Sequence, residues 1–551
     1  MTVDSGNVSP DVYAPTVEFT LAANAGRDLQ AATDADHDAF LGCKSAAVAF
    51  CFKTLRGPSN DTGSAGWRIY RRPLSGRKTS VARTSRTAYV TYDRISQDKK
   101  WVRSYLQRGK TWEIVMQNES PLYYEPFDPS CRAGLFDTYA RLHREAPVRQ
   151  CESGVWTVVR LDDVRILYTR TEAFSNRPNG AETVRPTVDM SDSSIAEKLA
   201  PIFEAMLLDT KELLSSSVIV GADPPIHTRI RGSVNRAFTR GRIEALRGYI
   251  DEEVARCLEG IDHAPTFDVY ADLAIQIPLR VMTRLFGLPA SDDEKFQRWA
   301  LMLATQLNAH ETRGTATWLA THYSLISEFA DYFVPLMTER AKNPGADLLS
   351  DIMAAEKDAL TASEGVLFVL TLLGAGIETT ANLIGNVTVE LLRNPDQLDL
   401  LLADPALVDA AIEESLRYDS PFQFVFRETT SDIELSGVTI PGGSIVLNMI
   451  GAANHDPAHF NDPDRFDITR KPAHVGFGQG IHFCLGAALA RMEARAALRG
   501  ILPHLREFAL DEEHIVDRPS LLIWGRLQIP LVRRSMATSG GTAQVGLQSE
   551  G

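Results

Sequence analysis

The sequence predicts a mostly helical protein with a few small β-sheets, built as a single large domain. Amphipathic helical segments dominate residues 119–535, and the strand-like pieces are short and lie at separate places. No internal repeat divides the chain into smaller units. Runs of helix interrupted by scattered short strands are typical of a helical core flanked by small sheets.

The composition is that of an ordinary globular protein. Of the 551 residues, 44% are hydrophobic and 23% are charged, and the formal net charge is -14. This acidic balance argues against a nucleic-acid partner. No apolar run approaches the roughly 18 residues needed to cross a bilayer, and the N-terminus lacks the pattern of a secretory signal. We therefore expect no membrane span and a cytoplasmic location.

The chain divides into three regions by composition. Residues 116–535 form the expected globular domain, and residues 536–551 are rich in Gly and Ser and are expected to be disordered. Residues 1–115 read as a disordered basic extension, with segments such as RRPLSGRKTSVARTSRT. Three interpretations of this extension stay open: a docking tail for an acidic partner, an extension without a role, or a segment absent from the native protein if translation starts at Met116.

Several elements follow from periodicity in the order of the chain. The segments LFDTYARLHREA and RIEALRGYIDEEVARCLEGI have the spacing of amphipathic helices. The segment VWTVVRLD, which includes Val155, reads as a strand, and DIELSGVTIPGGSIVLNMI, which begins at Asp432, reads as strands whose Gly-containing breaks suit a hairpin.

A long helix is predicted from Ser363 to Arg393. Thr361 and Glu364 form a capping-box pattern at its start, and an Asn-Pro pair at residues 394–395 marks its end. Its middle, GAGIETT at residues 374–380, contains poor helix formers. We expect either a local distortion where the hydrogen-bond ladder opens, or close packing of a neighbouring helix on the glycines.

The segment FGQGIHFCLGAALARMEARAAL, residues 477–498, combines a glycine-rich turn with a cysteine directly before a helix. Gly478, Gly480 and Gly486 suit a backbone that turns tightly and approaches another group closely. The helix start would stabilise a Cys484 thiolate. No second cysteine or histidine stands at zinc spacing, so a haem axial ligand fits this thiolate; the alternative is a buried structural cysteine.

The pattern FGxGxHxCxG at residues 477–486 resembles the cytochrome P450 family at every named position. The DPP-HxxxR and NHDP segments resemble the soluble bacterial members, and the resemblance covers roughly residues 119–535. It implies the cytochrome P450 fold and haem b, with Cys484 as the axial ligand of the iron. It also implies that Phe477, Gly478 and Gly486 lie against the haem.

The resemblance assigns further residues. Thr379 would donate a hydrogen bond to dioxygen, and Glu378 would belong to the proton relay. His227, Arg231, Arg427 and His482 would bind the haem propionates, and Glu414, Arg417 and Arg465 would form a buried structural network. Position in the family pattern suggests an apolar substrate pocket lined by Leu373, Ala375, Phe424, Val425 and Ile523, although each of these also fits the core.

The resemblance implies a monooxygenase that inserts one oxygen atom from O2 into a hydrophobic organic substrate. The chain contains no flavin, nicotinamide or iron–sulfur pattern, so we expect a separate ferredoxin-type donor with its reductase. This donor would dock near arginines around Cys484, such as Arg491. A peroxygenase and a haem-binding sensor without turnover remain alternatives, and the intact Glu378-Thr379 pair argues against both.

Overall fold

The computed structural model describes residues 122–176, 188–235, 238–308, 315–353, 360–520 and 522–534, together with four short strands nearer the N-terminus. The chain divides into two units, Met1–Tyr123 and Tyr124–Gly551. In the first unit β1 (Phe19–Ala22) pairs with β3 (Ser85–Ala88), and β2 (Gly66–Arg68) pairs with β4 (Thr91–Asp93). The rest of the extension predicted over residues 1–115, and the tail predicted over 536–551, lie outside the described residues.

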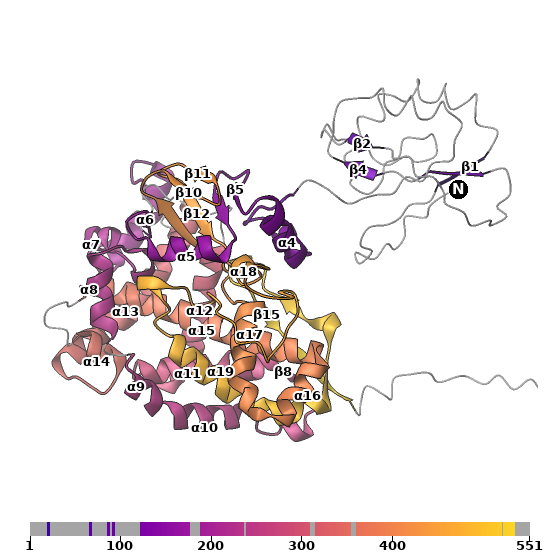
Figure 1. The fold of residues 1–551 in the computed structure, drawn as a ribbon. Coiled ribbons are helices and arrows are strands. Elements are labelled where there is room, and N and C mark those ends of the chain that lie inside the picture. Colours follow the sequence, from indigo (N-terminus) through magenta and orange to yellow (C-terminus); the bar gives the residue numbers. More distant parts are fainter. Residues whose placement is uncertain are drawn as a thin grey trace, which may run out of the picture. The chain divides into compact units, whose positions relative to one another are not determined.

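The second unit is mostly helical with small sheets, as the sequence predicts (Figure 1). Its described helices are α4 (Leu135–Glu145), α5 (Leu161–Thr169), α6 (Ser193–Ala205), α7 (Thr210–Ser215), α8 (Ile226–Asn235), α9 (Arg240–Ala245), α10 (Arg247–Cys257), α11 (Gln276–Leu285), α12 (Asp293–Asn308), α13 (Ala316–Lys342), α14 (Leu348–Met353), α15 (Ala362–Arg393), α16 (Pro395–Ala403), α17 (Val408–Tyr418), α18 (Ile450–Ala453) and α19 (Ala487–Ile501). Two short helical turns matter for the site: η4 (Val269–Ala274), a π-helix, and η7 (Gly480–His482), a 3-10 turn.

The strands described in this unit form four small sheets. The largest has the order β5-β6-β12-β9-β7, in which β12 pairs parallel with β6 and antiparallel with β9. The other sheets have the orders β13-β16-β8, β10-β11 and β14-β15. The strands are β5 (Val148–Gln150), β6 (Trp156–Val158), β7 (Phe174–Ser175), β8 (Thr266–Asp268), β9 (Val425–Thr429), β10 (Ile433–Leu435), β11 (Val438–Ile440), β12 (Ile445–Asn448), β13 (Phe508–Leu510), β14 (Val516–Asp517), β15 (Arg526–Gln528) and β16 (Pro530–Arg533).

Most elements predicted from periodicity are confirmed. LFDTYARLHREA forms α4, VWTVVRLD contains β6, and the segment that begins at Asp432 forms β10, β11 and β12. Ser436 and Gly437 form the β10-β11 turn with φ angles of 47° and 76°, as a hairpin with left-handed turn residues requires. RIEALRGYIDEEVARCLEGI was expected as one helix, but it divides into α9 and α10 at Leu246.

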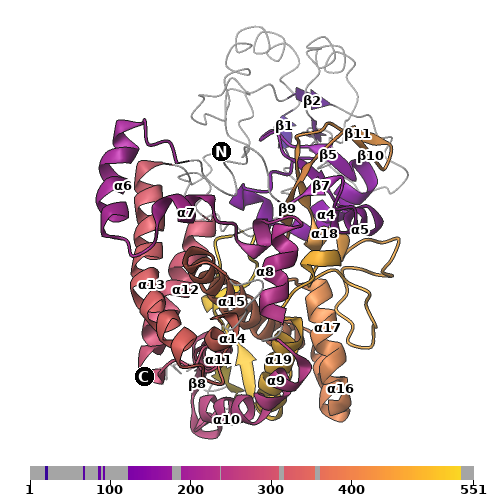
Figure 2. The ribbon, with the colours of Figure 1, turned by 90° about the vertical axis from the view of Figure 1, so that its left-hand side faces the viewer.

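The core is built around α15, which lies among α11, α12, α13, α17 and α19 in both ribbon views (Figures 1 and 2). Its capping box at Thr361 and Glu364 and its end at Asn394 are confirmed. The expected opening of the ladder is wrong, because the helix is continuous through residues 374–380. Gly374 instead allows close packing, since a Cβ there would lie 2.4 Å from Leu303 of α12.

By length and composition, α15 is apolar enough to cross a membrane, with a mean hydropathy of 1.6 over its most apolar stretch. This corrects the expectation that no apolar segment reaches a spanning length. However, 72% of that stretch is buried inside the protein. Such burial is what the central helix of a helical core requires, because most of its surface contacts other elements.

Candidate active site

The cysteine loop is a tight turn that ends at the start of α19. Gly478 and Gly480 have φ angles of 70° and 73°, and a Cβ on Gly480 would lie 2.4 Å from the carbonyl oxygen of Tyr168. The N–H of Cys484 donates to the carbonyl of Phe477 at 3.0 Å. Glycine is therefore required at residues 478 and 480 by backbone geometry. Gly486 has an ordinary φ of -85°, and nothing lies within 4 Å of where its Cβ would be.

The Cys484 side chain is half-buried and free. Burial raises the pKa of its thiol, whereas hydrogen bonds from the N–H groups of Gly486 and Ala487 and the charges of Arg231 and Arg491 lower it. The start of α19 thus lowers the pKa of the Cys484 thiol, as the sequence predicts, but burial has the larger effect and raises this pKa. A cation bound to the sulfur would favour the thiolate form.

Four basic residues predicted as propionate ligands come together beside this loop. The rings of His227 and His482 are 4.1 Å apart between centroids. Burial, and then the charges of His227, Arg427 and Arg231, lower the pKa of the His482 imidazole to about 3. Burial and then Arg231 lower the pKa of His227 as well. The cluster therefore carries excess positive charge in a place where water is scarce.

This basic cluster fits an anionic group. The Nε2 atoms of His227 and His482 are buried and have no hydrogen-bond partner among the described residues. Arg427 is only 6% exposed, and Arg231 donates to the carbonyl of Phe483 at 2.9 Å, which ties α8 to the cysteine loop. Buried polar atoms normally have partners, so unpaired nitrogens beside two arginines indicate a site for carboxylates such as haem propionates.

Tyr168, on α5, belongs to this site but carries no recognisable sequence motif. Its hydroxyl is buried and unpaired among the residues that the structure describes, and the guanidinium of Arg427 lies 5.4 Å from its ring centre. Its carbonyl oxygen occupies the space that a side chain at Gly480 would need. Only the packing of α5 against the cysteine loop brings Tyr168 here, and sequence periodicity does not predict that contact.

One face in the middle of α15 is open although most of the helix is buried. Ala375 is exposed, and Leu372, Gly376 and Thr379 are half-buried. These residues follow the i, i+3, i+4, i+7 spacing of a single helical face. The Thr379 hydroxyl donates to the carbonyl of Ala375 along this face. The open stripe, residues 372, 375, 376 and 379, is therefore a surface that a ligand can contact in the middle of the core.

Glu378 lies beside the open stripe but is only 1% exposed. Its Oε2 is 3.4 Å from Nη1 of Arg518, which is also buried. Burial raises the pKa of Glu378 to about 7, and the charge of Arg518 opposes this rise. A carboxyl with this pKa exchanges protons near neutral pH. Arg518 lies in the turn after β14, and no sequence motif points to it.

Two of the three residues predicted for a structural network, Glu414 and Arg417, form a fully buried pair. Arg417 and Glu414 are both 0% exposed and are joined by two hydrogen bonds of 2.9 and 2.8 Å. Arg465 contributes its backbone carbonyl, which accepts from Arg417 at 3.1 Å. The additional guanidinium on Glu414 belongs to Arg470, whose Nε lies at 3.3 Å. Arg465 therefore takes part through its main chain, and Arg470 is the side chain that the sequence analysis missed.

The predicted pocket residues separate into two groups. Ala375 is exposed on the open stripe and Val425 is half-buried, so both can contact a ligand. Leu373, Phe424 and Ile523 are each 1% exposed and belong to the packed interior. The prediction is corrected for these three, because side chains in this state leave no surface for a substrate.

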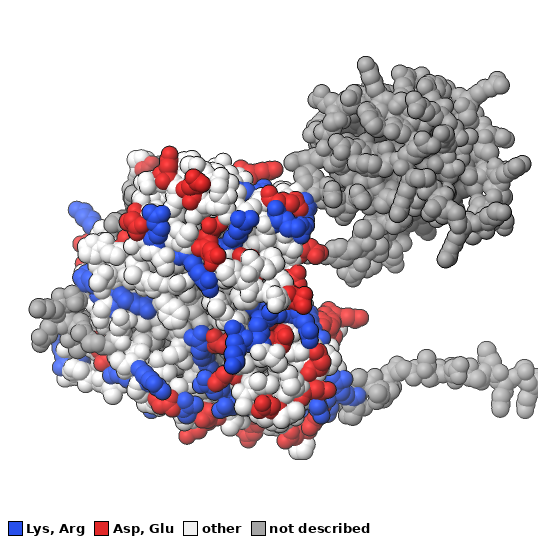
Figure 3. Space-filling model, viewed as in Figure 1, with Lys and Arg blue, Asp and Glu red and all other residues white. Residues whose placement is uncertain are grey.

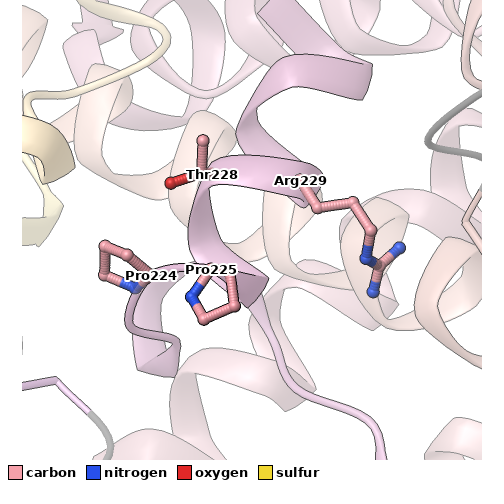
Figure 4. Close-up of a pocket in the computed structure, with 4 residues that line it drawn as sticks. All are labelled: Pro224, Pro225, Thr228 and Arg229. Atoms are coloured by element: carbon pink, nitrogen blue, oxygen red, sulfur yellow. The ribbon is translucent and has the colours of Figure 1, made fainter.

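A shallow hollow of about 580 Å³ lies at the start of α8 and is lined by Pro224, Pro225, Thr228 and Arg229 (Figure 4). Thr228 and Arg229 come between His227 and Arg231 on the same helix. The first turn of α8 therefore borders both the basic cluster and this hollow.

Arg491, predicted to bind an electron donor, is already engaged within the protein. Its guanidinium donates to both carboxylate oxygens of Glu413 at 2.6 and 2.8 Å and lies 4.4 Å from the ring centre of Phe477. Basic and acidic side chains are interspersed over the face that carries α17 (Figure 3). Ile481 and Phe483 of the cysteine loop are 38% and 42% exposed.

Comparison with known proteins agrees with this geometry. A family described as Cytochrome P450 matches residues 401–530. Cytochrome P450 107B1 of Saccharopolyspora erythraea is 35% identical over 420 residues, which cover 74% of this chain and 96% of that protein. The chain belongs to the cytochrome P450 family. Vitamin D(3) 25-hydroxylase of Pseudonocardia autotrophica is 36% identical and covers 71% of this chain and 92% of its own length.

Solved structures that resemble this chain are also cytochromes P450. Cytochrome P450 CYP109Q5 from Chondromyces apiculatus is 32% identical, with a TM-score of 0.61 and coverage of 75% of this chain and 98% of that structure. CalO2 is 30% identical, with a TM-score of 0.63 and coverage of 75% and 99%. The protein therefore has the cytochrome P450 fold, uses haem b and is a monooxygenase of the oxidoreductase class.

Proposed function

We propose that this cytochrome P450 inserts one oxygen atom from O2 into a hydrophobic organic substrate, with electrons from a separate ferredoxin-type protein and its reductase. The observation that carries the residue assignments is the pair of unpaired, buried Nε2 atoms of His227 and His482 beside the Cys484 loop. This arrangement supports a haem held by Cys484 at the iron and by His227, His482, Arg231 and Arg427 at its propionates.

The bound haem supplies the redox-active iron at which dioxygen is activated. The chain itself contributes the thiolate of Cys484, a proton source and the mainly apolar open stripe. Thr379 lies on the open stripe, and rotation about one bond turns its hydroxyl proton from the Ala375 carbonyl toward that side. With a pKa of about 7, Glu378 both holds and releases a proton near neutral pH.

A hydrophobic substrate is supported by the apolar residues around the open stripe. Leu372, Ala375 and Gly376 present no charged or hydrogen-bonding side chain, so hydrocarbon contact dominates recognition there. Relatives include a vitamin D(3) 25-hydroxylase and a 6-deoxyerythronolide B hydroxylase, which share 36% and 33% identity with this chain. Their names support a large, mainly apolar substrate for this enzyme.

The electron donor is proposed to dock on the cysteine loop, where Ile481 and Phe483 are exposed, and the protein is proposed to act in the cytoplasm. Arg491 serves mainly to hold the loop, because Glu413 already neutralises it. An apolar centre surrounded by interspersed charges suits a transient protein contact.

The test compares two ways of driving the reaction with a panel of terpenoid, steroid, fatty-acid and polyketide substrates. We expect product with ferredoxin, reductase and NAD(P)H under ¹⁸O2, with one labelled oxygen atom in each product molecule. Equal product from hydrogen peroxide alone, without donors, would establish the peroxygenase alternative. Substrate binding without turnover in either condition would establish the sensor alternative.

A further inference from the structure

Three buried polar side chains meet between α5, the five-stranded sheet and the cysteine loop. Tyr168 of α5, Arg427 of β9 and Asn448 of β12 are 5%, 6% and 0% exposed. The Arg427 guanidinium lies 5.4 Å from the ring centre of Tyr168, and both Arg427 and Asn448 act on the pKa of the Tyr168 phenol. The three polar groups therefore belong to one site, although they come from three separate parts of the sequence.

The pairing of β9 with β12 places Arg427 and Asn448 on the same face of the sheet. The two strands are antiparallel, and Val446 lies opposite Arg427. Two residues further along β12, Asn448 lies opposite Val425. Side chains two residues apart on a strand point to the same face, and residues directly opposite each other share a face. Arg427 and Asn448 are therefore diagonal neighbours on the face that Tyr168 meets.

Tyr168 also touches the cysteine loop, because α5 packs against η7. A Cβ on Gly478 would lie 3.5 Å from Cε1 of Tyr168 and 3.8 Å from its hydroxyl oxygen. The phenol hydroxyl therefore lies between the basic cluster and the loop that carries Cys484.

The polar atoms of this site lack hydrogen-bond acceptors among the described residues. The Tyr168 hydroxyl and both amide atoms of Asn448 are buried and unpaired there. Arg427 donates to the carbonyl of its neighbour Phe426 at 2.6 Å, and no carboxylate in the described ranges forms an ion pair with it. A guanidinium, a protonated phenol and an amide NH2 group can all donate. Since buried polar groups normally have partners, this donor set indicates a missing acceptor.

The charge state of these groups narrows the chemistry of the acceptor. Burial raises the pKa of Tyr168 to about 12, while the charge of Arg427 and then Asn448 lower it. The phenol therefore keeps its proton near neutral pH and remains a donor. Burial lowers the pKa of Arg427, whereas Tyr168 and Asp223 raise it, and a guanidinium stays charged in proteins. One buried cation beside two neutral donors suits a single carboxylate.

We propose that Tyr168 and Asn448 are haem-binding residues, whose hydroxyl and amide N–H groups donate to the haem propionate that Arg427 neutralises. This propionate is then held by one charged donor and two neutral donors. The guanidinium supplies the opposite charge, and the two neutral donors fix where the carboxylate lies, because hydrogen bonds are directional. This inference rests on the haem site proposed at Cys484.

The experiment measures the rate at which the haem-loaded enzyme loses haem to an apoprotein acceptor. We expect Tyr168→Phe to lose haem about tenfold faster than wild type, because a hydrogen bond to a charged group is removed. Asn448→Leu keeps most of the volume and should act in the same direction. Tyr139→Phe is the matched control, because Tyr139 is 1% exposed and its hydroxyl donates to Gln423 at 2.7 Å within the protein. This control should leave the rate of haem loss unchanged.

Altered haems separate a propionate contact from a packing effect. Wild type, Tyr168→Phe and Asn448→Leu are each reconstituted with the two haem isomers in which a methyl group replaces one propionate. We expect both substitutions to speed haem loss with one isomer and to have no effect with the other, which lacks the acceptor. Equal acceleration with both isomers would show that the side chains act through packing and would overturn the proposal. Wild-type rates in both variants with natural haem would overturn it as well.

Two spectra complete the test. The resonance Raman band of propionate bending should shift in Tyr168→Phe and stay in place in Tyr139→Phe, and an unchanged band in both would contradict the contact. The reduced, carbon-monoxide-bound spectrum of Tyr168→Phe should match that of wild type, because Cys484 is untouched. If wild type itself lacked a thiolate-type spectrum, the haem site proposed at Cys484 would fail, whereas a rate change confined to one haem isomer would still support the propionate contact.

Discussion

The hydrogen bonds of Arg417, in the buried network behind the cysteine loop, allow us to predict how much this side chain contributes to the free energy of unfolding. Arg417 donates to Glu414 at 2.9 and 2.8 Å and to the carbonyls of Asn454, Pro463 and Arg465 at 3.0, 2.7 and 3.1 Å. Arg417→Met keeps most of the volume but removes all five bonds. A buried carboxylate that loses its partner costs about 3–5 kcal/mol. This is a large part of the roughly 5–15 kcal/mol by which most domains are stable.

The assay is urea unfolding followed by haem absorbance and circular dichroism. The control is Arg506→Met, which removes a pair of similar length, 2.7 Å to Asp399, between side chains that are 61% and 65% exposed. Such an exposed pair contributes about 0–1 kcal/mol. We expect Arg417→Met to lower the free energy of unfolding by at least 3 kcal/mol, or to prevent haem incorporation. A loss equal to that of the control would refute the reasoning.

Three further predictions concern single residues. His227→Phe removes the donor that we propose for a haem propionate. It should speed haem loss about tenfold, measured by transfer to an apoprotein acceptor, whereas substitution of the exposed His514 by Phe should not. Gly480→Ala should lower stability by about 1–3 kcal/mol, because φ is 73° and the new methyl group meets the Tyr168 carbonyl; a change below about 0.5 kcal/mol would contradict this. Burial raises the pKa of Glu493 from 4.5 to about 8, so the folded state loses stability as pH rises from about 4.5 to about 8. Glu493→Gln should therefore gain stability relative to wild type across that window, and a difference independent of pH would argue against it.

Local sequence signals predicted the parts of the site that lie on continuous segments. The capping box at Thr361 and Glu364 and the hairpin at Ser436 and Gly437 depend on residues close in the chain, so their patterns predicted the structure directly. The need for glycine at residues 478 and 480 of the cysteine loop was predicted for the same reason.

The parts that sequence reasoning missed depend on contacts between distant segments. Tyr168 reaches the cysteine loop only because α5 packs there, and Arg518 reaches α15 from a turn near the C-terminus. The prediction of a distortion in α15 was wrong because tertiary packing overrides weak helix propensity. The packing of Gly374 against Leu303 is one such contact. The prediction that Phe424 lines the pocket rested on its position in the family pattern. That position does not say which way the side chain packs, and Phe424 lies in the packed interior.

The most direct test of the account is the absorption spectrum of the reduced, carbon-monoxide-bound protein. The comparison uses wild type, Cys484→Ala and, as a control, Cys257→Ala, which changes a cysteine of α10 away from the loop. We predict a strongly red-shifted Soret band in wild type and Cys257→Ala that is lost in Cys484→Ala, because we propose that the Cys484 thiolate is the axial ligand. The same red-shifted band in Cys484→Ala, or ordinary histidine-type haem bands in wild type, would contradict the assignment of Cys484 as the iron ligand.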